Sequence, residues 1–180
     1  MSDPIIVSLS HERLRDILQE AGYRVETLTD PVANVTYLRS ATNGLGFEVR
    51  PGNLIAGGGE FVDLVLVAVL QVQGNLPLDL VNRWNAGRRF ARLQLSRPFL
   101  ALTLDVSVAG GVALNHLRAQ IEIWDHLVRE LIVYLREELP KLASLDGGDL
   151  ATAETNPDKR PSPTTPLTAS VAESATTPAL

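Results

Sequence analysis

Apolar residues recur every three or four positions in three segments of the chain, and this spacing predicts three helices. The first covers 10–21, where Ser10 can cap the first turn and Gly22 can close the last. A short second helix is expected to have Pro77 in its first position. The third and longest covers about 112–139. Its apolar stripe, which favours packing on a sheet over a coiled-coil seam, holds Leu114, Leu117, Ile121, Trp124, Val128, Leu131 and Leu135, widened by Ile123, Leu127 and Ile132.

Alternating apolar and polar residues predict the strands. Candidate strands lie at 23–28, 35–41 and 45–49. The last two are joined by Asn43-Gly44, a pair that favours a type I′ hairpin turn because both residues accept positive φ. These segments therefore predict neighbouring antiparallel strands.

The segment 61–72 is apolar at both alternating sets of positions, apart from Asp63 and Gln71. This pattern predicts a central strand that is covered on both faces. Residues 91–95 and 99–108 follow as a second predicted hairpin with one face in the core. That face is expected to hold Ala91, Leu93, Leu95, Leu100, Leu102, Leu104, Val106 and Val108.

Together these elements predict an α+β domain over residues 1–142. An antiparallel sheet would be covered by the N-terminal helix, the short middle helix and the long C-terminal helix, which contributes Leu117, Trp124 and Leu131. From 143 to 180 the chain is rich in Pro, Thr and Ala, a composition that cannot bury enough apolar surface to order itself. We expect this segment to be a disordered tail.

Composition narrows the function classes. The net charge of −5 does not favour binding to nucleic acid, which requires phosphates to be neutralised. The chain has no cysteine, so disulfides, thiolate catalysis and cysteine-ligated metals are excluded. The longest apolar run, 61–72, is too short to span a membrane, and the N-terminal residues do not resemble a secretion signal. We expect a cytoplasmic protein that binds neither nucleic acid nor membranes.

The densest positive charge lies in NRWNAGRRFARLQL, residues 82–95. Its arginines could grip an anion bidentately, with asparagines as further ligands. The alternative is that the residues around Gly87 only mark a helix end followed by a strand, with basic side chains complementing the helix dipole. The candidate anion- or partner-binding residues are Arg88, Arg89, Arg92, Asn82 and Asn85.

The sequence offers no catalytic or metal-binding pattern. His116 and His126 are ten residues apart on the predicted long helix, not at the four-residue spacing of a zinc motif. Asp125 and Arg129 are spaced as a surface ion pair on that helix. Gly110-Gly111 precedes a helix but lacks the spacing of a dinucleotide-binding loop, so a tight turn is expected. We predict no catalytic residue, no metal site and no cofactor.

The order of a few asparagine, aspartate and glycine residues nonetheless resembles a known family. Asn82 and Asn85 precede a strand, Asp105 lies near the end of the next, and Gly110-Gly111 stands ahead of the long helix. In this arrangement residues 8–140 resemble the YbjN-like bacterial domain. The turn Ser96-Arg97-Pro98 departs from the acidic, glycine-bearing turn usual in that family.

The resemblance implies a fold similar to that of type III secretion chaperones, which are small, acidic, usually dimeric and non-enzymatic. It also implies a regulatory role in bacterial signalling, and it brings no catalytic residues. The sequence therefore predicts a non-enzymatic protein-interaction module, chaperone-like or regulatory, that binds an extended segment of a partner protein and can form a homodimer. The alternative is a small-ligand or anion sensor that uses Arg88, Arg89 and Arg92.

Overall fold

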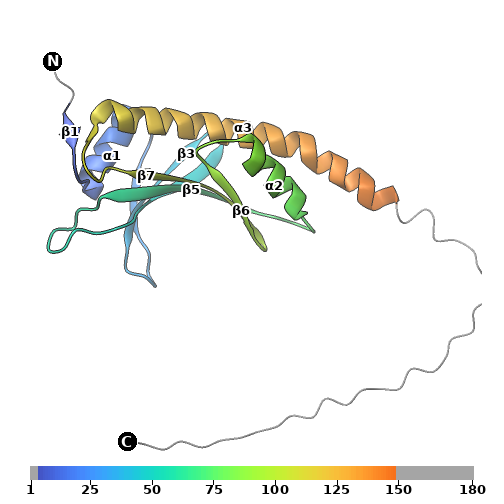
Figure 1. The fold of residues 1–180 in the computed structure, drawn as a ribbon. Coiled ribbons are helices and arrows are strands. Elements are labelled where there is room, and N and C mark those ends of the chain that lie inside the picture. The colour runs from blue at the N-terminus through green and yellow to red at the C-terminus, as the bar shows by residue number, and fades with distance from the viewer. Residues whose placement is uncertain (1–3, 149–180) are drawn as a thin grey trace, which may run out of the picture. The chain divides into compact units, whose positions relative to one another are not determined.

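The structure, a computed structural model, describes residues 4–148, with side-chain surroundings up to Leu142 (Figure 1). The elements follow in the order β1 (Ile5–Ile6), α1 (His11–Glu20), β2 (Glu26–Thr29), β3 (Thr36–Thr42), β4 (Leu45–Pro51), β5 (Asp63–Gln71), α2 (Leu78–Gly87), β6 (Arg92–Ser96), β7 (Phe99–Ser107), β8 (Val112–Ala113) and α3 (Leu114–Gly148). The strands form an antiparallel sheet and the helices lie on one side of it, so the fold is α+β, as the sequence predicts.

A six-stranded antiparallel sheet forms the framework, with strand order β2-β3-β4-β5-β7-β6. The predicted hairpin between β3 and β4 is confirmed, and Thr42 pairs with Leu45 across a two-residue turn. Asn43 and Gly44 have φ of 51° and 80°, as a type I′ turn requires. The second predicted hairpin, β6–β7, is also confirmed, with Ser96 paired to Phe99.

All three helices pack on one face of this sheet (Figure 1). Trp124 is fully buried, and its ring lies edge-on to Phe47 of β4, with centroids 5.6 Å apart. At the other end of the sheet, Tyr134 donates a hydrogen bond of 2.7 Å to the Leu80 carbonyl, which joins α3 to α2. The predicted cover of the sheet by the long helix is therefore correct, with Leu117 and Leu131 also buried.

The prediction that 61–72 is covered on both faces is wrong. In β5, Leu64, Leu66 and Ala68 are buried, whereas Val69 is 52% exposed on the opposite face. No helix within the described residues covers that opposite face (Figure 1). The strand is central in the sheet, but a central position fixes only its hydrogen bonds. It does not determine how many faces are covered.

The start of the long helix also differs from the prediction. Residues 112–113 are paired with Ile5–Ile6 as the small β1–β8 sheet, so α3 begins at Leu114. Gly110 and Gly111 form the expected tight turn, with φ of 81° and 92°. The helix then continues past the predicted end at Leu139 to Gly148. The rest of the predicted tail, 149–180, lies outside the described residues.

The starts of β2 and α2 also differ from the sequence prediction. The strand predicted at 23–28 is β2, Glu26–Thr29, so Tyr23 precedes the strand rather than forming part of it. Pro77 is the residue before α2, with extended φ and ψ, and not its first helical residue. Proline lacks the N–H that a strand or helix interior would use, and either position at the start of a helix satisfies this restriction.

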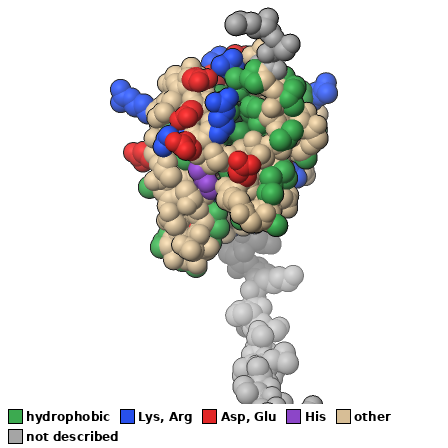
Figure 2. Space-filling model, turned by 90° about the vertical axis from the view of Figure 1, so that its left-hand side faces the viewer, with side chains coloured by type: hydrophobic (Ala, Val, Ile, Leu, Met, Phe, Trp, Pro, Cys, Tyr) green, Lys and Arg blue, Asp and Glu red, His purple; other side chains and the backbone are tan. Residues whose placement is uncertain are grey.

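Figure 2 faces the end of the domain at which β1 and α1 lie, and hydrophobic side chains gather over part of it. The exposed apolar side chains around β1 include Ile5 and Val7, which are 66% and 60% exposed and both lie beside Gly111. This end is therefore one apolar area on the domain. The uncovered face of the large sheet, with Val69, is another.

Candidate functional site: a groove between α3 and the free edge of β3

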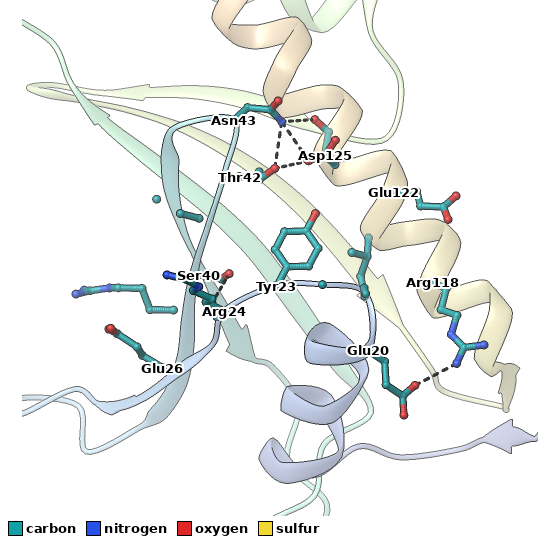
Figure 3. Close-up of a pocket in the computed structure, with 16 residues that line it drawn as sticks. Glu20, Tyr23, Arg24, Glu26, Ser40, Thr42, Asn43, Arg118, Glu122 and Asp125 are labelled. Atoms are coloured by element: carbon teal, nitrogen blue, oxygen red, sulfur yellow. Dashed lines mark hydrogen bonds and ion pairs between the residues drawn. The ribbon is translucent and has the colours of Figure 1, made fainter.

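A groove of about 1100 Å³ separates α3 from the β3–β4 hairpin and the segment that follows α1 (Figure 3). It is much larger than a second hollow of about 210 Å³, which is lined by residues of β3, β4 and β5. It is lined by Glu20, Ala21, Gly22, Tyr23, Arg24, Glu26, Arg39, Ser40, Ala41, Thr42, Asn43, Gly46, Arg118, Ile121, Glu122 and Asp125. We call it the α3 groove.

The chain turns sharply after α1 to form one wall of the α3 groove. Gly22 has φ of 91° and donates to the carbonyl of Gln19, while Tyr23 donates to the carbonyl of Leu18. These two hydrogen bonds end the helix in a glycine-dependent turn, as the sequence predicts. The turn directs the chain towards β3, where Ser40 Oγ donates to the Arg24 carbonyl at 2.7 Å.

The edge of β3 is open where it meets the α3 groove. The pairing of β2 with β3 ends at Glu26 and Arg39, so residues 40–42 of β3 extend past their last neighbour on that side. In an antiparallel hairpin closed at Thr42 and Leu45, alternate residues direct their backbone N–H and C=O away from the partner strand. Ala41 is such a residue, and no backbone hydrogen bond to it from that side occurs within residues 4–148.

Asp125 of α3 fixes the tip of the hairpin. Its Oδ1 accepts hydrogen bonds from Thr42 Oγ1 and from Asn43 Nδ2, which also donates to the Asp125 carbonyl (Figure 3). The predicted pair with Arg129 is confirmed, at 2.8 Å between Arg129 Nη2 and Asp125 Oδ2. One carboxylate therefore holds the β3–β4 turn against the helix and sets the width of the groove at that end.

Tyr23 stands inside the α3 groove, with its hydroxyl pointing towards Thr42 and Asp125 (Figure 3). Its ring packs edge-on against Phe47, with centroids 5.7 Å apart. Burial raises the pKa of Tyr23, and the negative charge of Asp125 raises it further. The phenol therefore stays protonated at neutral pH and serves as a hydrogen-bonding group, not as a base.

Charges of both signs border the α3 groove. Glu20 and Arg118 form an ion pair of 3.1 Å that joins the end of α1 to α3 (Figure 3). Arg39 is paired with Glu48 at 3.2 Å. The side chain of Arg24 has no ion-pair partner among the described residues, although its backbone carbonyl is engaged by Ser40. The groove thus offers a free guanidinium beside the open edge of β3.

Most of the ionisable side chains that line the α3 groove are engaged with other side chains. Within residues 4–148 no group of three side chains could hold a metal ion. Glu20 and Asp125 are engaged by arginines, and Tyr23 has a raised pKa. The Thr42 hydroxyl donates to the Asp125 carboxylate, and the same carboxylate also accepts from Asn43 and Arg129.

The arginines predicted as an anion site do not point to a common centre. Arg88 forms an ion pair of 2.9 Å with Glu130 and lies over the Trp84 ring at 5.2 Å. Arg92 on β6 is paired with Asp105 on β7 at 2.5 Å. Arg89 lies over the Phe90 ring at 5.2 Å. Each guanidinium therefore has a different neighbour, and an anion would have to displace Glu130 and Asp105 to bind Arg88 and Arg92.

The two predicted asparagine ligands have different surroundings. Asn85 accepts from the Leu93 N–H at 2.8 Å and donates to the Leu93 carbonyl at 2.9 Å, so its amide pairs with the outer edge of β6. Asn82 is exposed on the same helix. The Asn85 side chain therefore makes the two hydrogen bonds that a neighbouring strand would make to Leu93, and it joins α2 to the sheet.

We expect Asn85→Ala to lower the free energy of unfolding by about 1–2 kcal/mol, because both backbone groups of Leu93 lose their partner. Asn82→Ala is the matched control on α2 and is expected to change the free energy of unfolding by less than about 0.5 kcal/mol. Urea denaturation followed by circular dichroism measures both. Equal effects of the two substitutions would contradict this role for Asn85.

Sequence reasoning missed the α3 groove. Tyr23 was assigned to a strand, and Ala41 lies within a predicted strand with nothing to mark its free backbone. Asp125 was recognised only as the partner of Arg129. The Asn43-Gly44 turn was identified, but its contact with α3 depends on where the helix crosses the sheet, which no local pattern encodes.

Comparison with models of known protein families identifies the family to which this chain belongs. The YbjN family, described as "Putative bacterial sensory transduction regulator", matches residues 10–137. The chain belongs to the YbjN family. The YbjN match runs from the cap of α1 into α3 and includes all six strands of the large sheet and the whole α3 groove. No curated protein and no solved structure matches the chain significantly.

None of the helices within residues 4–148 combines the length and apolar character that crossing a bilayer requires.

Proposed function

We propose that this YbjN domain is a non-enzymatic regulatory module that binds an extended segment of a partner protein in the α3 groove. The observation that carries the proposal is the unpaired edge of β3 at residues 40–42, which borders the α3 groove. An added strand gains main-chain hydrogen bonds from such an edge, and its alternate side chains gain specificity from neighbouring pockets. The family description, a regulator, agrees with a binding role.

The α3 groove offers both apolar and charged side chains to a bound polypeptide. A strand placed beside Ala41 would direct alternate side chains towards Tyr23, which is half-buried, and Ile121, which is buried. The side chains between them would face away from α3, near Arg24. Main-chain pairing with Ala41 and an acidic side chain near Arg24 are therefore the expected features of the bound segment.

Groove charge disfavours polyanions as ligands. Glu20, Glu26, Glu122 and Asp125 outnumber Arg24, Arg39 and Arg118 among the lining residues. Nucleic acids and anionic membranes are bound through an excess of basic groups, so neither is the expected partner. The anion sensor built on Arg88, Arg89 and Arg92 is less well supported, since two of these arginines already have carboxylate partners.

We expect peptides selected from a random display library on the full chain to bind along β3. N-methylation of such a peptide at alternate residues removes the N–H groups that face β3 and should weaken binding by up to about tenfold per position, while methylation at the intervening residues should not. Isothermal titration calorimetry measures both series. Equal loss at every position, or no loss at any, would contradict strand addition.

A matched pair of variants tests the same edge from the protein side. Ala41→Pro removes the free N–H, and proline is tolerated where a strand's N–H faces outward. Ala41→Ser keeps it. We expect the proline variant alone to lose peptide binding while both variants keep the wild-type circular dichroism spectrum. Unchanged binding by Ala41→Pro would exclude β3 as the docking edge.

A further inference from the structure

The turn between α2 and β6 holds an aromatic residue in a strained backbone conformation. Phe90 has φ of 73°, and the Ala91 N–H donates to the Arg89 carbonyl at 3.0 Å, so the three residues form a γ-turn of the rare, positive-φ kind. Glycine adopts this conformation without strain, whereas a bulky residue seldom does. The Phe90 side chain is also 60% exposed. Neither the turn nor the core therefore accounts for a phenylalanine at this position.

The same turn leaves part of β7 without a neighbouring strand. β6 pairs only with residues 99–103, although β7 continues to Ser107. Alternate residues of a strand direct their backbone N–H and C=O to the same side, so Asp105 and Ser107 point these groups towards the side on which β6 lies. Both residues are exposed, and no backbone hydrogen bond reaches them from that side within residues 4–148. We call residues 105–107 the β7 edge.

One flank of α3 lies beside the β7 edge. Gln120 on this flank borders a small apolar hollow together with Val106 of β7, and Glu130 is paired with Arg88 at 2.9 Å. Ile123 follows Gln120 by three residues and precedes Glu130 by seven, so it lies on the same flank, where it is half-buried. A segment that lay along the β7 edge would therefore meet an apolar side chain on its helix side.

Arg89 adds an available positive charge to this surface. Its guanidinium lies over the Phe90 ring at 5.2 Å and forms no ion pair with a carboxylate among the residues that the structure describes. The other two arginines of the segment, Arg88 and Arg92, are each engaged by a carboxylate. Aromatic residues and arginine contribute most to the binding energy of protein interfaces. The pair of Arg89 and Phe90 is therefore complementary to an apolar side chain that lies beside a carboxylate.

We propose that Phe90 and the β7 edge form a second docking site, which binds an extended segment of a partner protein that carries an apolar residue next to an acidic one. The segment adds to β7 in the place that β6 leaves at Phe90, and its main chain pairs with Asp105 and Ser107. Its apolar side chain packs against Phe90, and its carboxylate reaches Arg89. The strained turn is retained because it presents the ring to this segment. The site shares no residue with the α3 groove and does not rest on the function proposed for that groove.

Peptide selection with a matched depletion tests this proposal. A random display library is depleted on the full chain carrying Phe90→Gly, which keeps the turn and the α3 groove but lacks the ring, and is then selected on the wild type. We expect the selected peptides to combine apolar and acidic residues and to bind the wild type at least about tenfold more tightly than Phe90→Gly in calorimetric titrations. Phe99→Ala is the control, because Phe99 is a similarly exposed ring (46%) at the other end of β7, and it should bind as the wild type does. A selection that yields no such peptide, or equal losses for the two variants, would overturn the proposal.

Two further measurements separate this site from the α3 groove and from the fold. Ala41→Pro should leave binding of these peptides unchanged, while the bound peptide slows amide hydrogen exchange of Asp105 and Ser107. Peptides that fail to bind Ala41→Pro would belong to the α3 groove and would refute the site at Phe90, so the two proposals fail independently. Phe90→Gly should unfold at a temperature no lower than that of the wild type, because glycine relieves the strain of the turn. A clearly lower unfolding temperature would assign the ring to the fold and contradict the proposal.

Discussion

Trp124→Ala is expected to lower the free energy of unfolding by about 3–5 kcal/mol, the range for removing a fully buried aromatic side chain. Trp124 is 0% exposed and is where α3 meets Phe47 of β4. Its loss leaves a cavity between helix and sheet that the neighbouring side chains fill only in part. Urea denaturation followed by circular dichroism gives the difference.

Val133→Ala is the matched control for this prediction. Val133 is on the same helix but is 48% exposed, so the substitution should change the free energy of unfolding by less than about 0.5 kcal/mol. If both variants were equally stable, α3 would not be the element that covers the sheet, and the fold described above would be incorrect in its main packing contact.

The second large effect is expected from Asp125→Ala, which should cost about 2–3 kcal/mol because a charged acceptor of several hydrogen bonds is lost. Thr42 and Asn43 lose their contact with α3, and Arg129 loses its ion pair. Amide hydrogen exchange of residues 40–46 should accelerate more than exchange elsewhere. Glu137→Ala, at an exposed position of the same helix, should leave both stability and exchange unchanged.

Asp125→Ala should also change the titration of Tyr23. Part of the rise in its pKa comes from the charge of Asp125, so the variant lowers the pKa towards the ordinary value while burial keeps it somewhat raised. A phenol with a raised folded-state pKa contributes stability that is present below its unfolded pKa, near 10, and lost as the pH rises through the folded value. The wild type should therefore lose stability above that pH, and the variant should lose less.

Spectrophotometric titration at alkaline pH measures this effect, with Tyr23→Phe identifying which of the three tyrosines is responsible. An unchanged Tyr23 titration in Asp125→Ala would contradict the contact between the two side chains.

Local patterns were sufficient to predict most of the fold. The stripe through Leu117, Trp124 and Leu131 has helical spacing, and all three are buried against the sheet. The Asn43-Gly44 pair specifies a turn type through backbone sterics alone. Such features depend on residues close together in the chain, which is why a single sequence reveals them.

The features that the sequence analysis predicts wrongly or misses depend on residues far apart in the chain. Val65, Val67 and Val69 resemble a strand buried on both faces, but nothing in the strand itself indicates whether a second layer exists. The β1–β8 pairing joins residues more than a hundred positions apart and is only two residues long on each strand. For the same reason the α3 groove, formed where β2 stops pairing with β3, left no local signal.

The central claim is that the α3 groove binds a protein segment along β3, and amide chemical-shift mapping with a selected peptide tests it most directly. The account predicts the largest shifts at residues 23–26, 40–43 and 118–125, with slowed exchange of the Ala41 amide. Shifts centred on Arg88, Arg89 and Arg92, with residues 40–43 unaffected, would contradict it.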